Sequence, residues 1–201
     1  MRFLILSSFV LQFVCAPLFG ADFRPPAVPL VTHDPYFSIW STSDDLAKSE
    51  TRHWTGTIQS LTSLIRVDGK PYFLMGGRRA PANVFAQQSV KVLPTHTIYE
   101  LEGAGVHVTL TFLTPSLPQD LDILSRPATY VTWQVHATDG RTHPVQLYFD
   151  AGSQIVVNTD DEPAVWGRYK LGDLTVLRMG SQHQPILEKS GDNLRIDWGY
   201  L

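Results

Sequence analysis

Apolar and polar residues alternate with a period of two along most of the chain after residue 57. The clearest run covers residues 106–112, where the apolar positions are Val106, Val108, Leu110 and Phe112. Such alternation is typical of a β-strand with one buried face and one exposed face. After the N-terminal segment, no window shows the 3.6-residue apolar period of an amphipathic helix. The pattern therefore predicts an all-β protein.

Glycine-containing turns separate the predicted strands. Asp68-Gly69 lies between two apolar runs, and an Asp-Gly pair favours a type I′ hairpin because both turn residues need positive φ. Gly172-Asp173 marks a second hairpin in the same way. Ten or so short strands of this kind predict an antiparallel β-sandwich. Its predicted core consists of Val106, Val108, Leu110, Phe112, Val131, Trp133, Val135, Leu147 and Phe149.

Two later segments are predicted to extend the sheets. Residues 154–157 continue the apolar pattern, and the last strand is expected to carry Leu194, Ile196 and Trp198 on one face. The chain ends just beyond that strand without a polar cap or charged tail. We therefore expect a domain over residues 22–201 that is truncated at its C-terminus.

The first 21 residues have the composition of a signal peptide. A single positive charge at Arg2 precedes an apolar stretch from Phe3 to Val14, and small residues follow at Gly20 and Ala21, where a peptidase can cut. A membrane anchor is the alternative, but the run is shorter than the ~20 residues of a span and Pro17 interrupts it. The sequence predicts a secreted or periplasmic protein that is not held in a membrane after cleavage.

Composition excludes several classes of partner. The chain carries 16 Lys and Arg against 19 Asp and Glu, a formal net charge of −3, without a basic run. This argues against nucleic acid and anionic membranes as partners. The single cysteine, Cys15, lies in the predicted signal peptide, so the exported domain would depend on its apolar core and not on a disulfide.

Acidic clusters are the first candidates for catalysis or metal binding. They are Asp44 and Asp45, Asp120 and Asp122, and Asp160, Asp161 and Glu162. All fall in predicted turns, where a short carboxylate side chain caps main-chain N–H groups. The last cluster could also hold calcium, although it lacks the spacing of an EF-hand. The histidines show no zinc-binding spacing, so we assign no catalytic, cofactor-binding or metal-binding residue.

Residues 33–56 form the densest polar and aromatic stretch of the chain. Its candidate residues are Asp34, Tyr36, Trp40, Arg52, His53 and Trp54, with His33 beside them. One interpretation is a polar network that locks a corner of the sandwich, and the other is the wall of a substrate cleft. We favour the network, because buried polar groups usually serve structure. Trp and Arg are also enriched at interfaces, so this stretch is the predicted contact with a further domain.

Six phrases in this order resemble one protein family. They are His-Asp-Pro-Tyr-Phe-Ser-Ile-Trp (33–40), Thr-Arg-His-Trp-Thr-Gly (51–56), Ile-Arg-Val-Asp-Gly-Lys-Pro-Tyr (65–72), Leu-Pro-Gln-Asp-Leu-Asp-Ile-Leu-Ser-Arg-Pro (117–127), Val-Gln-Leu-Tyr-Phe-Asp-Ala (145–151) and Arg-Ile-Asp-Trp-Gly-Tyr-Leu (195–201). Together they are similar to the N-terminal region of the secreted glutaminase A family of fungi and bacteria. The resemblance covers nearly all of the chain after the signal peptide.

The resemblance implies a longer parent protein. In the family, a β-sandwich region precedes an α/α toroid like that of six-hairpin glycosidases, and the reported activity is hydrolysis of L-glutamine to L-glutamate and ammonia. The toroid is the expected catalytic domain and the partner of this region, and the substrate of the parent is a small molecule. No catalytic motif of the family maps onto these residues.

Three functions follow as hypotheses. The first is a non-catalytic β-sandwich region of an extracytoplasmic glutaminase-like hydrolase. The second is the N-terminal domain of a glycoside hydrolase, because the implied architecture is shared with such enzymes. The third is a stand-alone carbohydrate-binding module, because exposed Trp and Tyr rings can stack on sugars.

Overall fold

The computed structural model describes residues 25–77 and 83–201, and nearly all of its regular structure is strand. The predicted signal peptide lies outside the described residues. The strands are β1 (Val28–Asp34), β2 (Phe37–Ser41), β3 (Arg52–His53), β4 (Leu61–Val67), β5 (Lys70–Met75), β6 (Asn83–Val84), β7 (Ala86–Val92), β8 (His96–Gly103), β9 (Val106–Leu113), β10 (Tyr130–Ala137), β11 (Val145–Ala151), β12 (Ala164–Leu171) and β13 (Leu174–Ser181). The helical elements are α1 (Leu121–Leu124) and the single 3-10 turn η1 (Ser153–Ile155). The predicted all-β class is confirmed.

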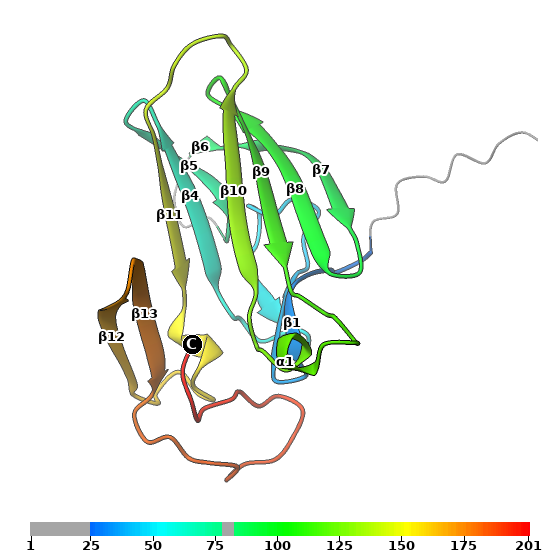
Figure 1. Cartoon of the computed structure of the whole chain (residues 1–201), viewed down its shortest axis with the longest axis vertical. Coiled ribbons are helices and arrows are strands. Elements are labelled where there is room, and N and C mark those ends of the chain that lie inside the picture. Colours follow the sequence, from blue (N-terminus) through cyan, green and yellow to red (C-terminus); the bar gives the residue numbers. More distant parts are fainter. Residues whose placement is uncertain (1–24, 78–82) are drawn as a thin grey trace, which may run out of the picture.

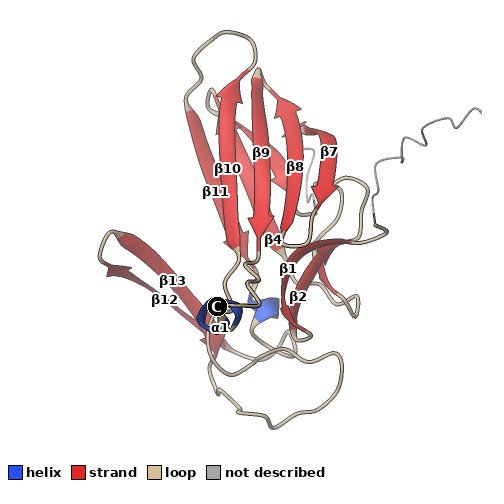
Figure 2. Ribbon diagram, turned by 45° about the vertical axis from the view of Figure 1, so that its right-hand side comes forward, coloured by secondary structure: helices blue, strands red, loops and turns tan. Residues whose placement is uncertain are grey.

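Two four-stranded sheets form the sandwich (Figures 1 and 2). One sheet has the order β10-β9-β8-β7 and the other β11-β4-β5-β6, and every pairing is antiparallel except β5 with β6. β10 and β11 are both edge strands, and consecutive residues of the chain pass from one to the other between the sheets. A small sheet, β1-β2-β3, lies at one end, and the β12–β13 hairpin forms a separate two-stranded sheet.

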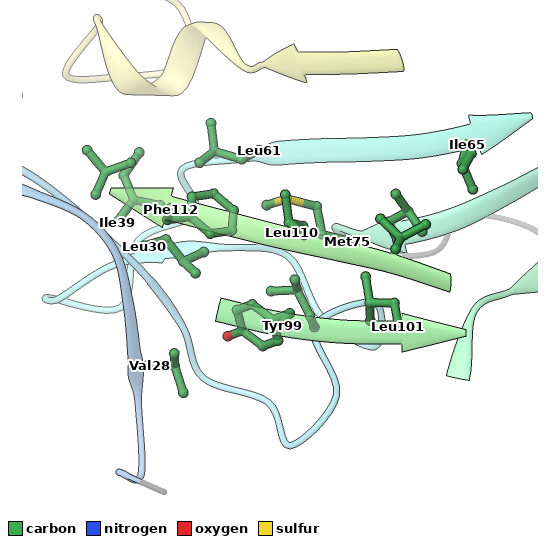
Figure 3. Close-up of a cluster of buried hydrophobic side chains, with 14 of the residues drawn as sticks. Val28, Leu30, Ile39, Leu61, Ile65, Met75, Tyr99, Leu101, Leu110 and Phe112 are labelled. Carbon is green, nitrogen blue, oxygen red and sulfur yellow. The ribbon is translucent and has the colours of Figure 1, made fainter. Parts of the chain in front are cut away.

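The core lies between the two large sheets (Figure 3). Val106, Val108, Leu110 and Phe112 of β9 are at most 2% exposed, as predicted. They meet side chains from β4, β5 and β8, including Ile65, Met75 and Tyr99 in Figure 3. At about 25 cal/mol per Å² of apolar area, this burial is the main stabilising contribution to the domain.

Part of the predicted core is not buried. Leu147 is 45% exposed and Phe149 is 38% exposed, while Val131, Trp133 and Val135 are only partly buried against the core. The reason is their position on the edge strands β11 and β10, beyond which no further strand covers them in the described residues. Alternation identified the inward face correctly, but a side chain at the edge of a sheet has a neighbour on only one side.

The predicted hairpin turns are present. Asp68 and Gly69 have φ of 51° and 81°, as a type I′ turn requires, and join β4 to β5. Gly172 has φ of 57° in the turn between β12 and β13. The register of both hairpins is thereby set by the turn, in agreement with the sequence pattern.

Two predicted strands are absent from the structure. Residues 153–155 form η1 instead of a strand, and residues 194–198 have no strand partner. Side chains bind the main chain of the last segment: Asn158 Oδ1 accepts from Arg195 N at 2.7 Å, and Ser181 donates to the carbonyl of Asp197. These bonds replace a strand ladder, which apolar alternation could not reveal. Trp198, predicted on the apolar face of the last strand, is 37% exposed.

The longest connection, 114–129, crosses one end of the sandwich and contains α1. Asp120 caps this short helix, because its Oδ1 accepts the N–H of Ile123 at 3.1 Å. Over the described parts of the chain, no helix has the length and apolar character of a membrane span.

Candidate functional site

The polar and aromatic stretch 33–56 begins with a tight turn between β1 and β2. Asp34 Oδ1 accepts the N–H groups of Tyr36 at 2.7 Å and Phe37 at 3.1 Å. This is the local pattern by which Asp stabilises a turn. The carboxylate of Asp34 is therefore engaged by the main chain, and the carbonyl of Pro35 is turned toward β3 and the residues that follow it.

His53 and Trp54 converge on that carbonyl. His53 Nε2 lies 2.8 Å from Pro35 O, and Trp54 Nε1 donates to the same oxygen at 2.7 Å. The other ring nitrogen of His53, Nδ1, bonds Thr55 Oγ1 at 2.7 Å. Because His53 is 1% exposed, burial lowers the pKa of its ring, and the nearby Arg195 lowers it further. Both ring nitrogens of His53 thus stabilise the corner of the sandwich that residues 33–56 form.

Trp40 and Arg52 lie on the opposite face of the β2–β3 pair. They face each other in the ladder, next to the pair Ile39 and His53, and neighbouring residues of a strand point to opposite faces. Trp40 Nε1 donates to Ser38 Oγ at 2.7 Å, and the Arg52 guanidinium donates to Gly56 O at 2.8 Å. The candidate residues of β2 and β3 therefore divide between two faces, with Trp40 and Arg52 on one and His53 on the other.

His33 has a different set of contacts. Its ring stacks on Phe37 at 5.2 Å between centroids, and Nε2 bonds Thr129 Oγ1 at 3.1 Å. Burial lowers the pKa of the ring, although Asp34 opposes this effect. The histidine links the small sheet to the connection before β10.

The C-terminal segment completes the corner, which the sequence did not reveal. Asn193 Oδ1 accepts from Thr55 Oγ1 at 2.6 Å and from Thr57 Oγ1 at 2.8 Å. Arg195 is 4% exposed, and its guanidinium donates to the carbonyls of Gln154, Asn193 and Leu194 at 3.1–3.2 Å. Burial lowers the pKa of Arg195. The contacts of Asn193 with Thr55 and Thr57 span more than a hundred residues, so no local pattern in the sequence marks them.

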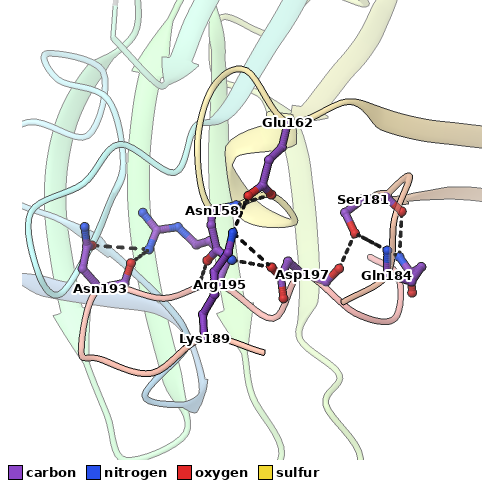
Figure 4. A network of polar contacts seen from close by, with 8 residues as sticks. All are labelled: Asn158, Glu162, Ser181, Gln184, Lys189, Asn193, Arg195 and Asp197. Atoms are coloured by element: carbon purple, nitrogen blue, oxygen red, sulfur yellow. Dashed lines mark hydrogen bonds and ion pairs between the residues drawn. The ribbon is translucent and has the colours of Figure 1, made fainter. Parts of the chain in front are cut away.

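A second group of polar side chains lies beside Arg195 (Figure 4). Asp197 is buried, which raises the pKa of its carboxyl, and it accepts a short hydrogen bond from Asn158 Nδ2. Lys189 Nζ lies 2.6 Å from Glu162 Oε1 and 3.8 Å from Asp197 Oδ2. Glu162 also accepts the N–H of Asn158 at 3.0 Å. In the acidic turn 160–162, which the sequence offered as a calcium site, the Glu162 carboxylate is thus paired with Lys189.

A cavity of about 300 Å³ lies between the stretch 33–56 and this network. Its lining includes Asp34, Tyr36, Lys189, Arg195, Asp197 and Trp198. With Glu188 included, three acidic and two basic residues line this small volume, which is an arrangement able to hold a small polar molecule. Each of Asp34, Arg195 and Asp197 already has partners within the protein. Within residues 25–77 and 83–201, no group of three His, Cys, Asp or Glu is placed to hold a metal ion.

One further charged cluster lies at the far end of the sandwich and was not predicted. His143 bridges two turns, with Nδ1 2.7 Å from Asp68 Oδ2 and Nε2 3.0 Å from Asp139 Oδ1. These two carboxylates raise the pKa of His143, and the histidine in turn lowers the pKa of Asp139. The cluster joins the β4–β5 turn to the β10–β11 connection, and so acts between the sheets.

Comparison with protein families identifies two regions. Residues 14–85 match a family described as domain of unknown function DUF4964, and residues 95–201 match one described as domain of unknown function DUF5127. The chain belongs to the DUF5127 family. The DUF5127 match begins just before β8 and includes the network of Figure 4, whereas the stretch 33–56 lies in the other match.

Two relatives named as glutaminases confirm the resemblance to the glutaminase A family. This DUF5127 chain is 29% identical over 184 residues to "Glutaminase A" of Aspergillus oryzae, with 88% of the chain and 26% of the relative covered. It is 27% identical over 213 residues to a "Probable glutaminase" of Arthroderma benhamiae, with 93% and 24% covered. The chain spans about a quarter of the length of these relatives. No solved structure matches it.

Proposed function

We propose that this chain is a non-catalytic β-sandwich region of an extracytoplasmic, glutaminase-like hydrolase. The parent protein would hydrolyse L-glutamine to L-glutamate and ammonia. The similarity to two proteins named as glutaminases supports the reaction class. The signal-like first 21 residues support the location outside the cytoplasm.

The observation that carries the non-catalytic role is the engagement of the polar groups at the corner. Amide hydrolysis needs a nucleophile or a general base that is free to reach the substrate. Both ring nitrogens of His53 have partners, the Asp34 carboxylate caps a turn, and the Arg195 guanidinium binds main-chain carbonyls. These bonds favour a rigid support over a reactive site.

The proposed partner is a helical domain elsewhere in the same polypeptide. In this arrangement the sandwich braces the catalytic domain, and the corner at residues 33–56 is part of the contact. Trp54 is 50% exposed and Tyr36 is 42% exposed, and aromatic side chains of this kind are enriched at interfaces.

Carbohydrate chemistry is the second candidate. Trp166 on the β12–β13 hairpin is 82% exposed, and an exposed indole can stack on a sugar ring. This favours a carbohydrate-binding module or a region of a glycoside hydrolase, and the same assay distinguishes it from the first proposal.

The test is to express the complete gene product and measure two activities. Ammonia release from L-glutamine is expected, with no reducing-sugar release from a panel of glycans. Sugar release without ammonia would replace the proposal by the glycoside hydrolase alternative. Glycan retention on an affinity gel, without either activity, would favour the binding module.

A further inference from the structure

The β12–β13 hairpin exposes many of its apolar side chains. It forms a two-stranded sheet and lies to one side of the sandwich in Figures 1 and 2. Its large exposed side chains are Val165, Trp166, Tyr169, Leu171, Leu174 and Leu177. An isolated two-stranded hairpin is marginally stable in water, and a third strand is usually needed.

The last described residues lie along the outer edge of β13. Met179 N donates to Leu201 O at 2.9 Å, and Leu201 N donates to Met179 O at 2.8 Å. Two residues that exchange both main-chain bonds form a hydrogen-bonded pair of an antiparallel ladder. Since Met179 faces Trp166 on β12, this second pair is on the other side of β13.

The sequence of β13 is suited to this contact at Gly180. A Cβ atom at Gly180 would lie 2.6 Å from Tyr200 Cδ1 and 2.7 Å from Gly199 O, so any other residue would push the segment away. Tyr200 in turn lies under the Arg178 guanidinium, whose Cζ is 4.1 Å from the ring centroid. A cation over an aromatic ring is attracted by the electron density of its face.

A side-chain amide fixes the approach of the same segment. Gln184 Nε2 donates to Gly199 O at 3.0 Å, and Gly199 N donates to Gln184 Oε1 at 2.5 Å. Gln184 Nε2 also donates to the main-chain carbonyl oxygen of Ser181, at the end of β13, at 2.8 Å. Residues 199–201 are thus positioned by contacts from β13 and from the loop after it.

We propose that β13 is an acceptor edge for a third antiparallel strand, formed by the polypeptide that follows Leu201. This inference rests on the proposed function, in which the chain is part of a longer protein. The Leu201–Met179 pair sets the register, so the next residue lies opposite Arg178 and later ones run along β13 toward Leu174. The main-chain groups of Leu177 and Thr175 point to the same edge as those of Met179, because alternate strand residues share an edge.

The first experiment measures amide hydrogen exchange of β13 by mass spectrometry, in the complete gene product and in purified residues 22–201. Peptides containing Leu177 and Thr175 are expected to exchange at least ~10-fold more slowly in the complete protein, because a hydrogen-bonded amide exchanges only on local opening. Equal exchange in the two proteins would overturn the proposal.

Two glycine variants of the complete protein make the test specific. Gly180→Ala is expected to abolish the slow exchange, since its Cβ would collide with Tyr200 and Gly199. Gly167→Ala is the matched control on β12, where a Cβ meets nothing within 4 Å, and it is expected to keep the slow exchange. Slow exchange in both variants would overturn the proposal.

A disulfide tests the register independently of any enzymatic activity. The residue after Leu201 and Arg178 would form a non-hydrogen-bonded pair, whose Cα separation of about 4.5 Å suits a disulfide. Cysteines at these two positions should cross-link under mild oxidation, whereas cysteines at Val176 and the same partner should not. Cross-linking of only the Val176 variant would show a different register. Neither hydrogen exchange nor cross-linking uses glutamine. The proposed third strand can therefore be disproved while the glutaminase proposal stands, and the glutaminase proposal can be disproved while the strand stands.

Discussion

Trp133 Nε1 donates a hydrogen bond to Ser63 Oγ of the opposite sheet at 3.1 Å. The same indole meets the ring of Phe149 edge-on, with 5.5 Å between centroids. Trp133 is on β10 and Phe149 on β11, the two edge strands at one side of the sandwich. One partly buried side chain therefore joins the two sheets where the core is least covered.

Replacing this side chain should measure its contribution to the sandwich. Trp133→Ala is expected to lower the free energy of unfolding by about 3 kcal/mol, near the low end for such truncations because the ring is only partly buried. Trp133→Phe retains most of the apolar contact and loses the bond to Ser63, so about 1 kcal/mol is expected. Urea denaturation of residues 22–201 gives both values. An alanine variant as stable as the wild type would show that Trp133 does not stabilise the packing of the two sheets at this edge.

The buried corner predicts a loss of stability in mild acid. The unfolded His53 takes up a proton near its usual pKa of 6.5, whereas in the folded protein burial holds the pKa lower. The unfolded state then binds more protons, so stability is complete above about pH 6.5 and falls as pH decreases toward the folded pKa. His33 shifts in the same direction.

Urea denaturation at pH 7.5 and pH 5.5 checks this prediction. The wild type is expected to be less stable at the lower pH, and His53→Gln should reduce that difference because the variant has no proton to take up at this position. The prediction fails if the variant and the wild type lose the same stability between the two pH values.

His143 should contribute in the opposite direction. Its hydrogen bonds to Asp139 and Asp68 raise the pKa of the ring above the unfolded value. The folded state then binds more protons, so this contribution is complete below about pH 6.5 and is lost as pH rises through the folded pKa. In Asp68→Asn one carboxylate is neutral, and an NMR titration of the His143 ring should show a lower pKa than in the wild type. An unchanged pKa would contradict the bridge.

Arg52 and Trp54 predict a separation of stability from activity. In the complete gene product, Arg52→Ala and Trp54→Ala remove the bonds to Gly56 O and Pro35 O, and each is expected to lower the midpoint of thermal unfolding by a few degrees, for a loss of about 1 kcal/mol. The kcat/KM for glutamine, measured well below that midpoint, should stay within about twofold. A variant that loses turnover with unchanged thermal unfolding would place the corner in the active site.

The sequence was sufficient for the fold class, for the buried face of β9 and for the two hairpin turns, because period-two alternation and turn residues such as Asp-Gly are local signals. It was insufficient where the outcome depends on distant neighbours. Leu147 has the same pattern as Leu110, yet Leu147 is exposed because β11 is an edge strand. Residues 194–198 alternate like a strand, yet side chains of Asn158 and Ser181 bind their main chain instead.

The candidate site shows the same limit. The turn at Asp34 could be anticipated, since Asp before Pro is a turn signal. The contacts of Asn193 with Thr55 and Thr57 join segments more than a hundred residues apart, and no local pattern marks them. The role of such a polar residue can be recognised only in the folded structure, where its partners lie beside it.

We propose that this region supports catalysis elsewhere in the protein and does none itself. The most direct measurement is ammonia release from L-glutamine by purified residues 22–201, compared at equal molar concentration with the complete gene product. We expect release by the complete protein and no release above the buffer rate by residues 22–201. Turnover of glutamine by residues 22–201, abolished by His53→Ala in a folded variant, would contradict it.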